Sequence, residues 1–205
     1  MELKQALQEL RKLEKRKFDQ TIDLIVNLKG VDIKKDNISA VIDLPNKIKE
    51  KSVGGFLTKK SELVKTITQP EFIGYKDKKM LKNLVKKYDF FIANASLMPS
   101  VATTFGKVLG PAGKMPSPQL GILPVESDAK IQAELDKISK SIKIRAKEAS
   151  IKLIVGRESM SDDQIIANIG AVYNGVVNAL PTKRENVKSV MLKLTMSKPI
   201  KVEVK

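Results

Sequence analysis

Hydrophobic and polar residues alternate regularly at both ends of the chain. Leucines recur every three or four positions over residues 3–13, which predicts an amphipathic helix that ends in the basic run 15–17. Residues 21–28, 38–44 and 190–196 instead place an apolar residue at every second position, the period of a strand with one buried face. We therefore expect the two chain ends to contribute antiparallel strands to a sheet.

The pattern is different in the middle of the chain. Residues 89–97 form an almost wholly apolar run, typical of a strand buried on both faces, and lie between a lysine-rich helix at 78–88 and a helix at 99–110. We also predict a helix over 59–67 and an extended segment over 70–75. Strands that alternate with helices indicate a small parallel α/β domain, which a further predicted helix, 128–142, completes.

The change of pattern predicts two domains. Residues 1–46 and 142–205 share the first pattern and residues 47–141 the second, so the fold class is predicted to be α/β, with a discontinuous outer domain around an inserted α/β domain. The returning chain is expected to form two strands around a turn near Lys147, and then a helix that begins at an N-cap, Ser161. Two parallel connections between the domains predict a hinge.

Composition removes most enzyme classes. The 205 residues include no cysteine and no histidine, which excludes thiolate nucleophiles, zinc sites with nitrogen or sulfur ligands, and imidazole acid–base catalysis. We predict no metal and no cofactor. No apolar run approaches the roughly 18 residues of a membrane span, and the first helix lacks a signal-peptide core, so a soluble, cytoplasmic protein with no membrane partner is expected.

The charge indicates a polyanionic partner. Lys and Arg number 38 against 23 acidic residues, a net charge of +15, which favours nucleic acid over a membrane surface. The outer segments carry 21 basic and 14 acidic residues and the inserted segment 17 and 9, so charge alone does not say which domain binds. A nonspecific nucleic-acid packaging protein stays an alternative at this point.

Residues 109–118, LGPAGKMPSP, match a phosphate-binding loop only in part. Gly113 and Lys114 fit the template, but Val108 stands at its first glycine position and Met115 replaces the hydroxyl residue that would ligate magnesium. A nucleotide-binding enzyme is therefore kept only as the alternative function. Because the loop follows a predicted helix, its glycines are expected to stop that helix, and the loop is either a structural turn or an RNA contact.

Three basic or hydroxyl-rich segments are candidate contacts. Residues 15–17 place three cations beside Phe18, which suits a phosphate contact with a stacking ring but equally a helix C-terminus beside a core phenylalanine. Residues 195–198 combine two hydroxyls with a lysine at a strand end, where they can hydrogen-bond ribose 2′-OH groups or simply form a turn. The lysines of 76–87 are interpreted as a solvated helix face.

Three segments, in this order, resemble the L-one family of large-subunit ribosomal proteins, in particular its archaeal branch: residues 17–30, 89–116 and 187–199. The resemblance implies an RNA-binding α+β domain of split β-α-β type, built from both chain ends, with an inserted Rossmann-like α/β domain. It also implies a structural constituent of the large subunit, not an enzyme. Such a protein binds a folded segment of large-subunit rRNA and forms the mobile lateral stalk. It assists release of deacylated tRNA from the exit site, represses translation of its own mRNA, and is a monomer when free.

The RNA-binding residues that the resemblance and the residue chemistry predict together are Lys17, Phe18, Thr21, Arg145, Lys147, Ser189, Thr195, Met196, Ser197 and Lys198. The predicted secondary contact with RNA or tRNA comprises Gly110, Gly113 and Lys114. This sequence has Ser197 where the family usually has glycine, and Ala112 where it usually has arginine. Because apolar and hydroxyl groups predominate in the main set, we predict recognition of RNA shape more than of charge.

Overall fold

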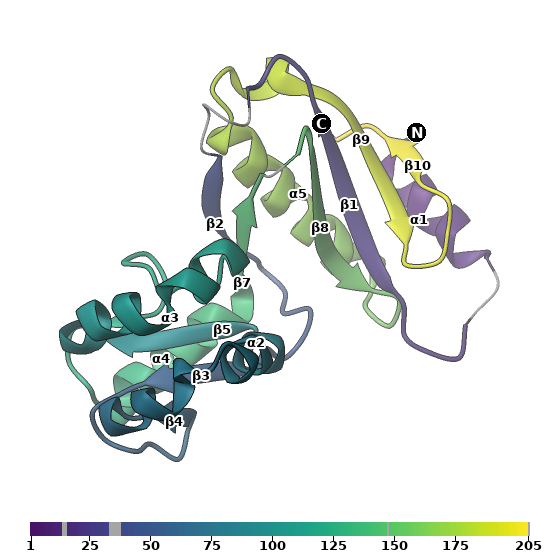
Figure 1. Cartoon of the computed structure of the whole chain (residues 1–205). Helices are drawn as coiled ribbons and strands as arrows, with labels where there is room; N and C mark the ends of the chain where they lie inside the picture. The colour runs from purple at the N-terminus through teal and green to yellow at the C-terminus, as the bar shows by residue number, and fades with distance from the viewer. Residues whose placement is uncertain (14–15, 33–37, 147, 205) are drawn as a thin grey trace. The chain divides into compact units, whose positions relative to one another are not determined.

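The computed structural model describes residues 1–13, 16–32, 38–146 and 148–204. The chain divides into two compact units (Figure 1). Unit 1 comprises Met1–Ile48 and Lys140–Lys205, and unit 2 comprises Lys49–Ser139. The chain thus leaves unit 1 once, builds unit 2 from a continuous segment, and returns.

Unit 1 is built on a four-stranded antiparallel sheet with the strand order β10-β9-β1-β8. Its strands are β1 (Thr21–Leu28), β8 (Ser150–Arg157), β9 (Val187–Leu194) and β10 (Ile200–Val202). Every second residue of β1 is buried, as the alternation predicted. Because β1 pairs with β8 on one side and with β9 on the other, the sheet joins the two ends of the chain.

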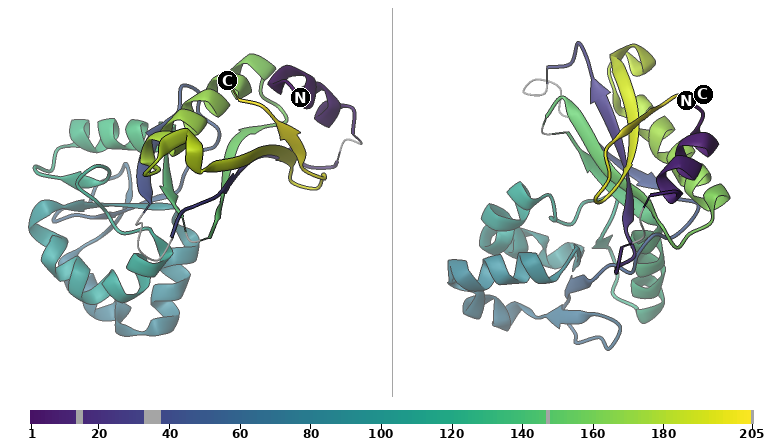
Figure 2. Two further views of the ribbon diagram at one scale, coloured as in Figure 1. Left: turned by 90° about the horizontal axis from the view of Figure 1, so that it is seen from above. Right: turned by 90° about the vertical axis from the view of Figure 1, so that its right-hand side faces the viewer.

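Two helices cover one face of this sheet, α1 (Leu3–Arg11) and α5 (Asp162–Ala179) (Figure 2). The predicted N-cap of α5 is confirmed, because Ser161 forms a capping box with Gln164. The first helix ends at Arg11, earlier than the sequence predicted. None of the described helices of unit 1 covers the other face of the sheet. A short helix, η3 (Lys183–Asn186), precedes β9.

A separate antiparallel ribbon in unit 1 is formed by β2 (Ser39–Asp43) and β7 (Ser141–Arg145). It packs on α5, where a Cβ at Gly175 would lie only 2.3 Å from the side chain of Ile42, so that this position needs a glycine. The two strands expected around a turn, β7 and β8, follow one another in the chain but pair with different partners, β2 and β1. Lys147, between them, lies outside the described residues.

Unit 2 contains a parallel sheet with the strand order β4-β3-β5-β6, which confirms the predicted α/β fold class. Its strands are β3 (Val53–Phe56), β4 (Lys65–Ile67), β5 (Phe90–Asn94) and β6 (Ile122–Leu123). The middle of β5 is buried, as expected for an apolar strand covered on both faces.

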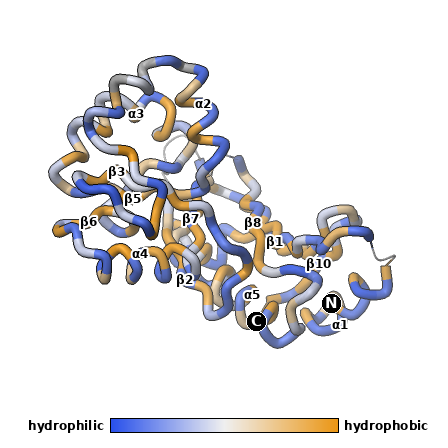
Figure 3. Tube along the Cα trace, turned by 90° about the horizontal axis from the view of Figure 1, so that it is seen from below, coloured by the Kyte–Doolittle hydropathy of each residue, from blue (hydrophilic) through white to orange (hydrophobic). Residues whose placement is uncertain are grey.

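Helices cover both faces of this parallel sheet (Figures 1 and 2). On one face lie α2 (Lys78–Lys87) and α3 (Met98–Ala112), which follows the short η2 (Ala95–Leu97); on the other lies α4 (Asp128–Lys140). Along these helices hydrophobic and hydrophilic positions alternate, as the changing colours of Figure 3 show. The core under α2 and α3 is aromatic and contains Phe56, Phe72, Phe91 and Phe105.

Two sequence predictions in unit 2 are wrong, and local hydrogen bonds explain both. The segment 59–67, predicted to be a helix, ends in strand β4. Before it, Ser61 N donates to Thr66 Oγ1 (3.1 Å), a side-chain bond that favours a turn over a helix. The segment 70–75, predicted to be extended, lies in a 3₁₀ helix, η1 (Gln69–Lys76), because Thr68 and Glu71 form a capping box at its start.

Candidate nucleic-acid interface

Thr21, at the start of β1, and Thr195, just after β9, form the centre of the candidate interface. Thr21 N donates to Thr195 Oγ1 (3.0 Å), Thr195 N donates to Thr21 O (3.0 Å), and the two hydroxyl oxygens are 3.0 Å apart. The Thr21 hydroxyl also lies 3.1 Å from Asp23 Oδ1, to which it can donate. With their protons used inside the protein, the two hydroxyls present free acceptor lone pairs, which suit a donor such as a ribose 2′-OH.

The turn after β9 is closed by Ser197. Its hydroxyl accepts a hydrogen bond from Leu194 N (2.8 Å) and lies 3.4 Å from Leu194 O and 3.2 Å from Lys198 O. Its own amide donates to Leu194 O (3.1 Å). The serine that replaces the usual glycine therefore directs its hydroxyl into the turn, and the turn holds Met196 outward.

Two apolar side chains stand in solvent beside this turn, Phe18 and Met196, which are 52% and 66% exposed. The alternative that Phe18 belongs to the core is therefore wrong. Each side chain borders a hollow. A hollow of about 610 Å³ is lined by Arg11, Arg16, Lys17, Phe18, Asp19, Glu158 and Ser159. A hollow of about 450 Å³ is lined by Leu13, Arg16, Gln20, Leu194, Met196, Ser197, Lys198 and Ile200.

We use the name threonine patch for the predicted residues that the structure brings together here: Lys17, Phe18, Thr21, Thr195, Met196, Ser197 and Lys198. Arg16 lines both hollows and adds a further cation to the patch. The surface therefore combines an exposed ring, an exposed thioether and hydroxyl acceptors, with cations around them. This combination suits stacking and ribose contacts together with a few phosphate contacts.

The patch rests on a buried glutamine that the sequence analysis did not find. Gln20 is only 3% exposed, and its side chain accepts from Met196 N (3.3 Å) and donates to Glu158 Oε2 (3.3 Å). The neighbouring Asp19 accepts from the amide (3.0 Å) and hydroxyl (2.9 Å) of Ser159 and pairs with Arg157 (3.4 Å). Residues near the end of β8 therefore hold both the segment before β1 and, through Gln20, the turn after β9.

Two other predicted RNA-binding residues lie at the opposite end of the sheet. Ser189 stands across from Asn27 and accepts from its Nδ2 (3.0 Å), six residues along β1 from Thr21, which is about 20 Å in a strand. Arg145 ends β7, four residues before Ala149, whose carbonyl oxygen accepts from Leu28 N (2.8 Å) at that end of β1. Lys147 lies outside the described residues.

Cations gather at this second end. Burial and the neighbouring Arg145 lower the pKa of Lys143, which lies on the same strand, β7. An anion bound here would relieve the repulsion between the two side chains. The predicted residues therefore form two groups, joined by the uncovered face of the sheet, where Asp23, Ile25 and Lys193 project between them.

The first part of the loop 109–118 is the end of a helix. α3 continues to Ala112, and Gly113, with φ 73°, stops it, as predicted; Gly110 lies inside the helix. Lys114 N donates to Leu109 O (3.0 Å), and Gly113 N donates to Gly110 O (3.0 Å). These amides complete the helix end, so they are not directed at a phosphate.

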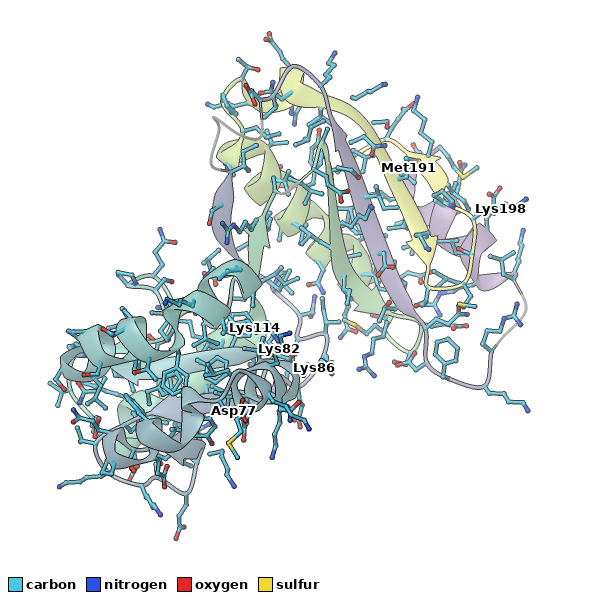
Figure 4. All side chains as sticks on the ribbon, in the orientation of Figure 1. Asp77, Lys82, Lys86, Lys114, Met191 and Lys198 are labelled. Carbon is cyan, nitrogen blue, oxygen red and sulfur yellow. The ribbon has the colours of Figure 1, made fainter. Side chains whose placement is uncertain are left out.

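The side chain of Lys114 is also used within unit 2. Its ammonium group donates to Val85 O and Tyr88 O, both at 2.8 Å, at the C-terminal end of α2 (Figure 4). A phosphate contact by Lys114 would have to replace these two bonds. The geometry therefore supports a structural role for this lysine, and it removes the donors that the nucleotide-binding alternative required.

The described ranges contain no group of three or more histidine, cysteine, aspartate or glutamate side chains able to hold a metal ion. Among the helices of these ranges, none is long and apolar enough to cross a membrane.

Comparison with known proteins gives a consistent result. The Ribosomal protein L1p/L10e family matches residues 10–198. The chain is 35% identical to large ribosomal subunit protein uL1 of Methanothermococcus thermolithotrophicus, over 97% of this chain and 96% of that protein. It is 34% identical to uL1 of Methanocaldococcus jannaschii (98% and 94% covered) and 32% identical to uL1 of Cenarchaeum symbiosum (98% and 95% covered).

Proposed function

The chain belongs to the ribosomal protein L1p/L10e family, as a large-subunit ribosomal protein of the archaeal type, and from this premise we propose that unit 1 binds a folded segment of large-subunit ribosomal RNA. The family is structural and not enzymatic. The proposed contact surface is the threonine patch together with Ser189, Arg145 and Lys147.

The observation that carries this proposal is the hydrogen-bonded pair Thr21–Thr195. Its free lone pairs accept from a donor, and the 2′-OH is the donor that distinguishes RNA from DNA. The exposed Phe18 and Met196 beside it offer an apolar surface for a base or a ribose. Because these groups are held by the fold before RNA binds, little ordering is needed on binding.

The spacing of the two groups of predicted residues favours a folded RNA. A partner must contact Thr195 and Ser189 at once, about 20 Å apart along β9. The uncovered face of the sheet lies between them and carries Lys152, Lys193 and Lys201. A compact RNA of matching shape can meet both groups, whereas an isolated nucleotide cannot.

The remaining parts of the proposal rest on the family. We propose that the protein forms the mobile lateral stalk of the ribosome in the cytoplasm, assists release of deacylated tRNA from the exit site, and represses translation of its own mRNA by binding a similar RNA shape. We propose that it is a monomer when free. The contact through Gly110, Gly113 and Lys114 is not part of the proposed surface, because the amides of Gly113 and Lys114 and the lysine ammonium serve helix ends and Gly110 lies inside α3.

The experiment replaces Thr195 by alanine in the full-length protein. Thr195→Ala removes the acceptor for Thr21 N and the hydroxyl of the interface, so affinity for the ribosomal RNA segment should fall by about 1–3 kcal/mol, or about 5- to 150-fold. The matched control is Thr103→Ala, an exposed threonine on α3 of unit 2 whose hydroxyl donates only to Pro99 O (2.8 Å). Equal affinities of Thr195→Ala and wild type would place the recognition site elsewhere.

A further inference from the structure

The two helical layers of unit 2 carry very different charge. α2 and α3 together contain six lysines and no acidic residue, whereas α4, on the other face of the sheet, contains three lysines and three acidic residues. Unit 2 as a whole has 15 basic and 9 acidic residues. Its positive charge is therefore concentrated on the α2–α3 side.

Three of these lysines form one stripe along α2: Lys79, Lys82 and Lys86. They recur at three- and four-residue spacing, on the side of the helix opposite to the buried Leu81 and Leu84. All three are exposed. At 1.5 Å per residue the stripe is about 10 Å long. We call it the lysine stripe.

Among the described residues, no acidic side chain neutralises the charges of the lysine stripe. None of its three members forms an ion pair with any other described residue. The nearest carboxylate in the sequence, Asp77, accepts from Lys79 N (3.1 Å) as the N-cap of the helix. Figure 4 shows Lys82 and Lys86 on α2, with Lys114 at the C-terminal end of the helix.

We propose that the lysine stripe binds the phosphate backbone of an RNA strand, as a second RNA contact that does not depend on RNA shape. A stripe about 10 Å long that carries three ammonium groups on flexible stems can contact up to about three phosphates of one strand. The side chains present no rigid, directional hydrogen-bonding frame. The contact therefore supplies affinity and orientation, not sequence selection.

An anionic membrane would be the other polyanion, but α2 is poorly suited to it. A helix that lies in a membrane interface needs an apolar face for the acyl chains. The leucines of α2 are buried in the core of unit 2, and the exposed apolar side chain on this helix is Met80 (54%). Charge complementarity without an insertion surface favours RNA.

This inference is independent of the proposed site in unit 1, and the test keeps the two apart. The probe is a 20-nucleotide oligouridine, which has phosphates but no folded shape for the threonine patch to recognise. The variant Lys79→Gln/Lys82→Gln/Lys86→Gln, made in the full-length protein, keeps good helix formers in α2. The control Lys130→Gln/Lys137→Gln/Lys140→Gln removes the same charge from α4.

We expect the affinity of the α2 variant for oligouridine to fall at least about tenfold in 50 mM salt. The slope of log K against log salt should also become shallower by about 2, because each lost phosphate contact reduces it by about 0.7. The α4 control should change by less than about twofold. Equal losses in both variants would mean that only net charge matters, and no loss in the α2 variant would mean that RNA does not meet this face; either result overturns the proposal.

Two further measurements decide between the alternatives. Loss of oligouridine binding in Thr195→Ala but not in the α2 variant would place this contact on the threonine patch and overturn the proposal, so a failure of the stripe and a failure of the patch give different results. Vesicles of phosphatidylserine provide the membrane comparison. If the α2 substitutions weaken vesicle binding and leave oligouridine binding unchanged, the partner is a lipid surface and the RNA proposal is wrong. We expect each variant to have the same midpoint temperature of thermal unfolding as the wild type.

Discussion

The threonine patch of unit 1 and the lysine stripe of unit 2 are both surfaces for RNA in our proposals, but the protein prepares them differently. In the patch, hydroxyl and amide groups are held by bonds of 2.8–3.3 Å from β1, β9 and Gln20. In the stripe, ammonium groups stand on flexible stems with no acidic partner among the described residues. Both units carry excess positive charge, 23 basic against 14 acidic residues in unit 1 and 15 against 9 in unit 2. Charge therefore does not distinguish the two surfaces. They differ in whether hydrogen bonds within the protein hold their polar groups in place.

The largest effect expected from this comparison is a response to salt. With about four to six cations on phosphate, binding of the full-length protein to the folded ribosomal RNA segment should follow a slope of log K against log salt of about −3 to −5. Raising salt fourfold should then weaken binding about 60- to 1000-fold, with specificity over oligouridine retained. A filter-binding series at four salt concentrations measures it. A slope near −10 would mean that many cations across the protein bind phosphates nonspecifically, and that the threonine patch and the lysine stripe do not differ in how they bind RNA.

A substitution that changes no charge but removes hydrogen bonds beneath the threonine patch should affect binding at the patch and not at the lysine stripe. Gln20→Met keeps the length of this buried side chain but leaves Met196 N and Glu158 Oε2 without their partner. We expect about 1–3 kcal/mol of lost stability and a comparable loss of affinity for the folded RNA, because the turn after β9 loses its support. Binding to oligouridine should be unchanged. Chemical unfolding and competitive RNA binding measure the two quantities, and a stable variant with wild-type RNA affinity would show that the turn needs no such support.

Unit 2 also contains an organised polar group, away from the lysine stripe. At the carboxyl ends of β3 and β5, the carboxylate of Glu126 accepts from Thr58 N (2.8 Å) and Asn94 Nδ2 (2.7 Å). Burial raises the pKa of Glu126, but the hydrogen bonds from Thr58, Asn94 and Lys59 outweigh it, so the pKa is lowered. The ionised form is therefore the one that the folded state prefers.

The lowered pKa of Glu126 predicts how the stability of unit 2 changes as the pH falls. Since the folded pKa of Glu126 lies below the unfolded value, its stabilisation is complete above the unfolded pKa and is lost as pH falls through the folded one. Glu126→Gln should cost about 1 kcal/mol at pH 7 and less at pH 3. Unfolding midpoints at the two pH values test this. Oligouridine binding should stay at the wild-type level, and a loss there would mean that the stripe depends on organisation after all.

Sequence reasoning predicted what depends on short-range periodicity. The buried side of β1 and the N-cap at Ser161 follow from two- and three-residue spacing. The helix predicted over 59–67 failed because Ser61 and Thr66 form a side-chain bond that no periodicity records. The elements with regular patterns were found, whereas the segments 59–67 and 70–75, whose structure depends on side-chain hydrogen bonds, were not.

The candidate site was predictable only where exposure and chemistry coincide. Phe18 and Thr195 became candidates because an aromatic ring beside cations and a hydroxyl at a strand end have recognisable uses, and the family resemblance then assigned them. Gln20 was missed because its role arises from the meeting of the segment before β1 with the turn after β9, at positions far apart in the chain. Ser189 and Thr195 lie about 20 Å apart because six residues of extended chain along β9 separate them.

The smallest effect is expected where this sequence departs from its family. The hydroxyl of Ser197 accepts from Leu194 N (2.8 Å) inside the turn, while the backbone bond from Ser197 N to Leu194 O (3.1 Å) closes the same turn without it. Ser197→Gly should therefore cost at most about 1 kcal/mol of stability and change RNA affinity by less than about threefold. Ser197→Ala, which keeps the Cβ, separates the two contributions. If glycine raised affinity tenfold while alanine did not, the Cβ of Ser197 would be holding the RNA away from the backbone, and the organised surface would owe its strength to close approach more than to its hydrogen bonds.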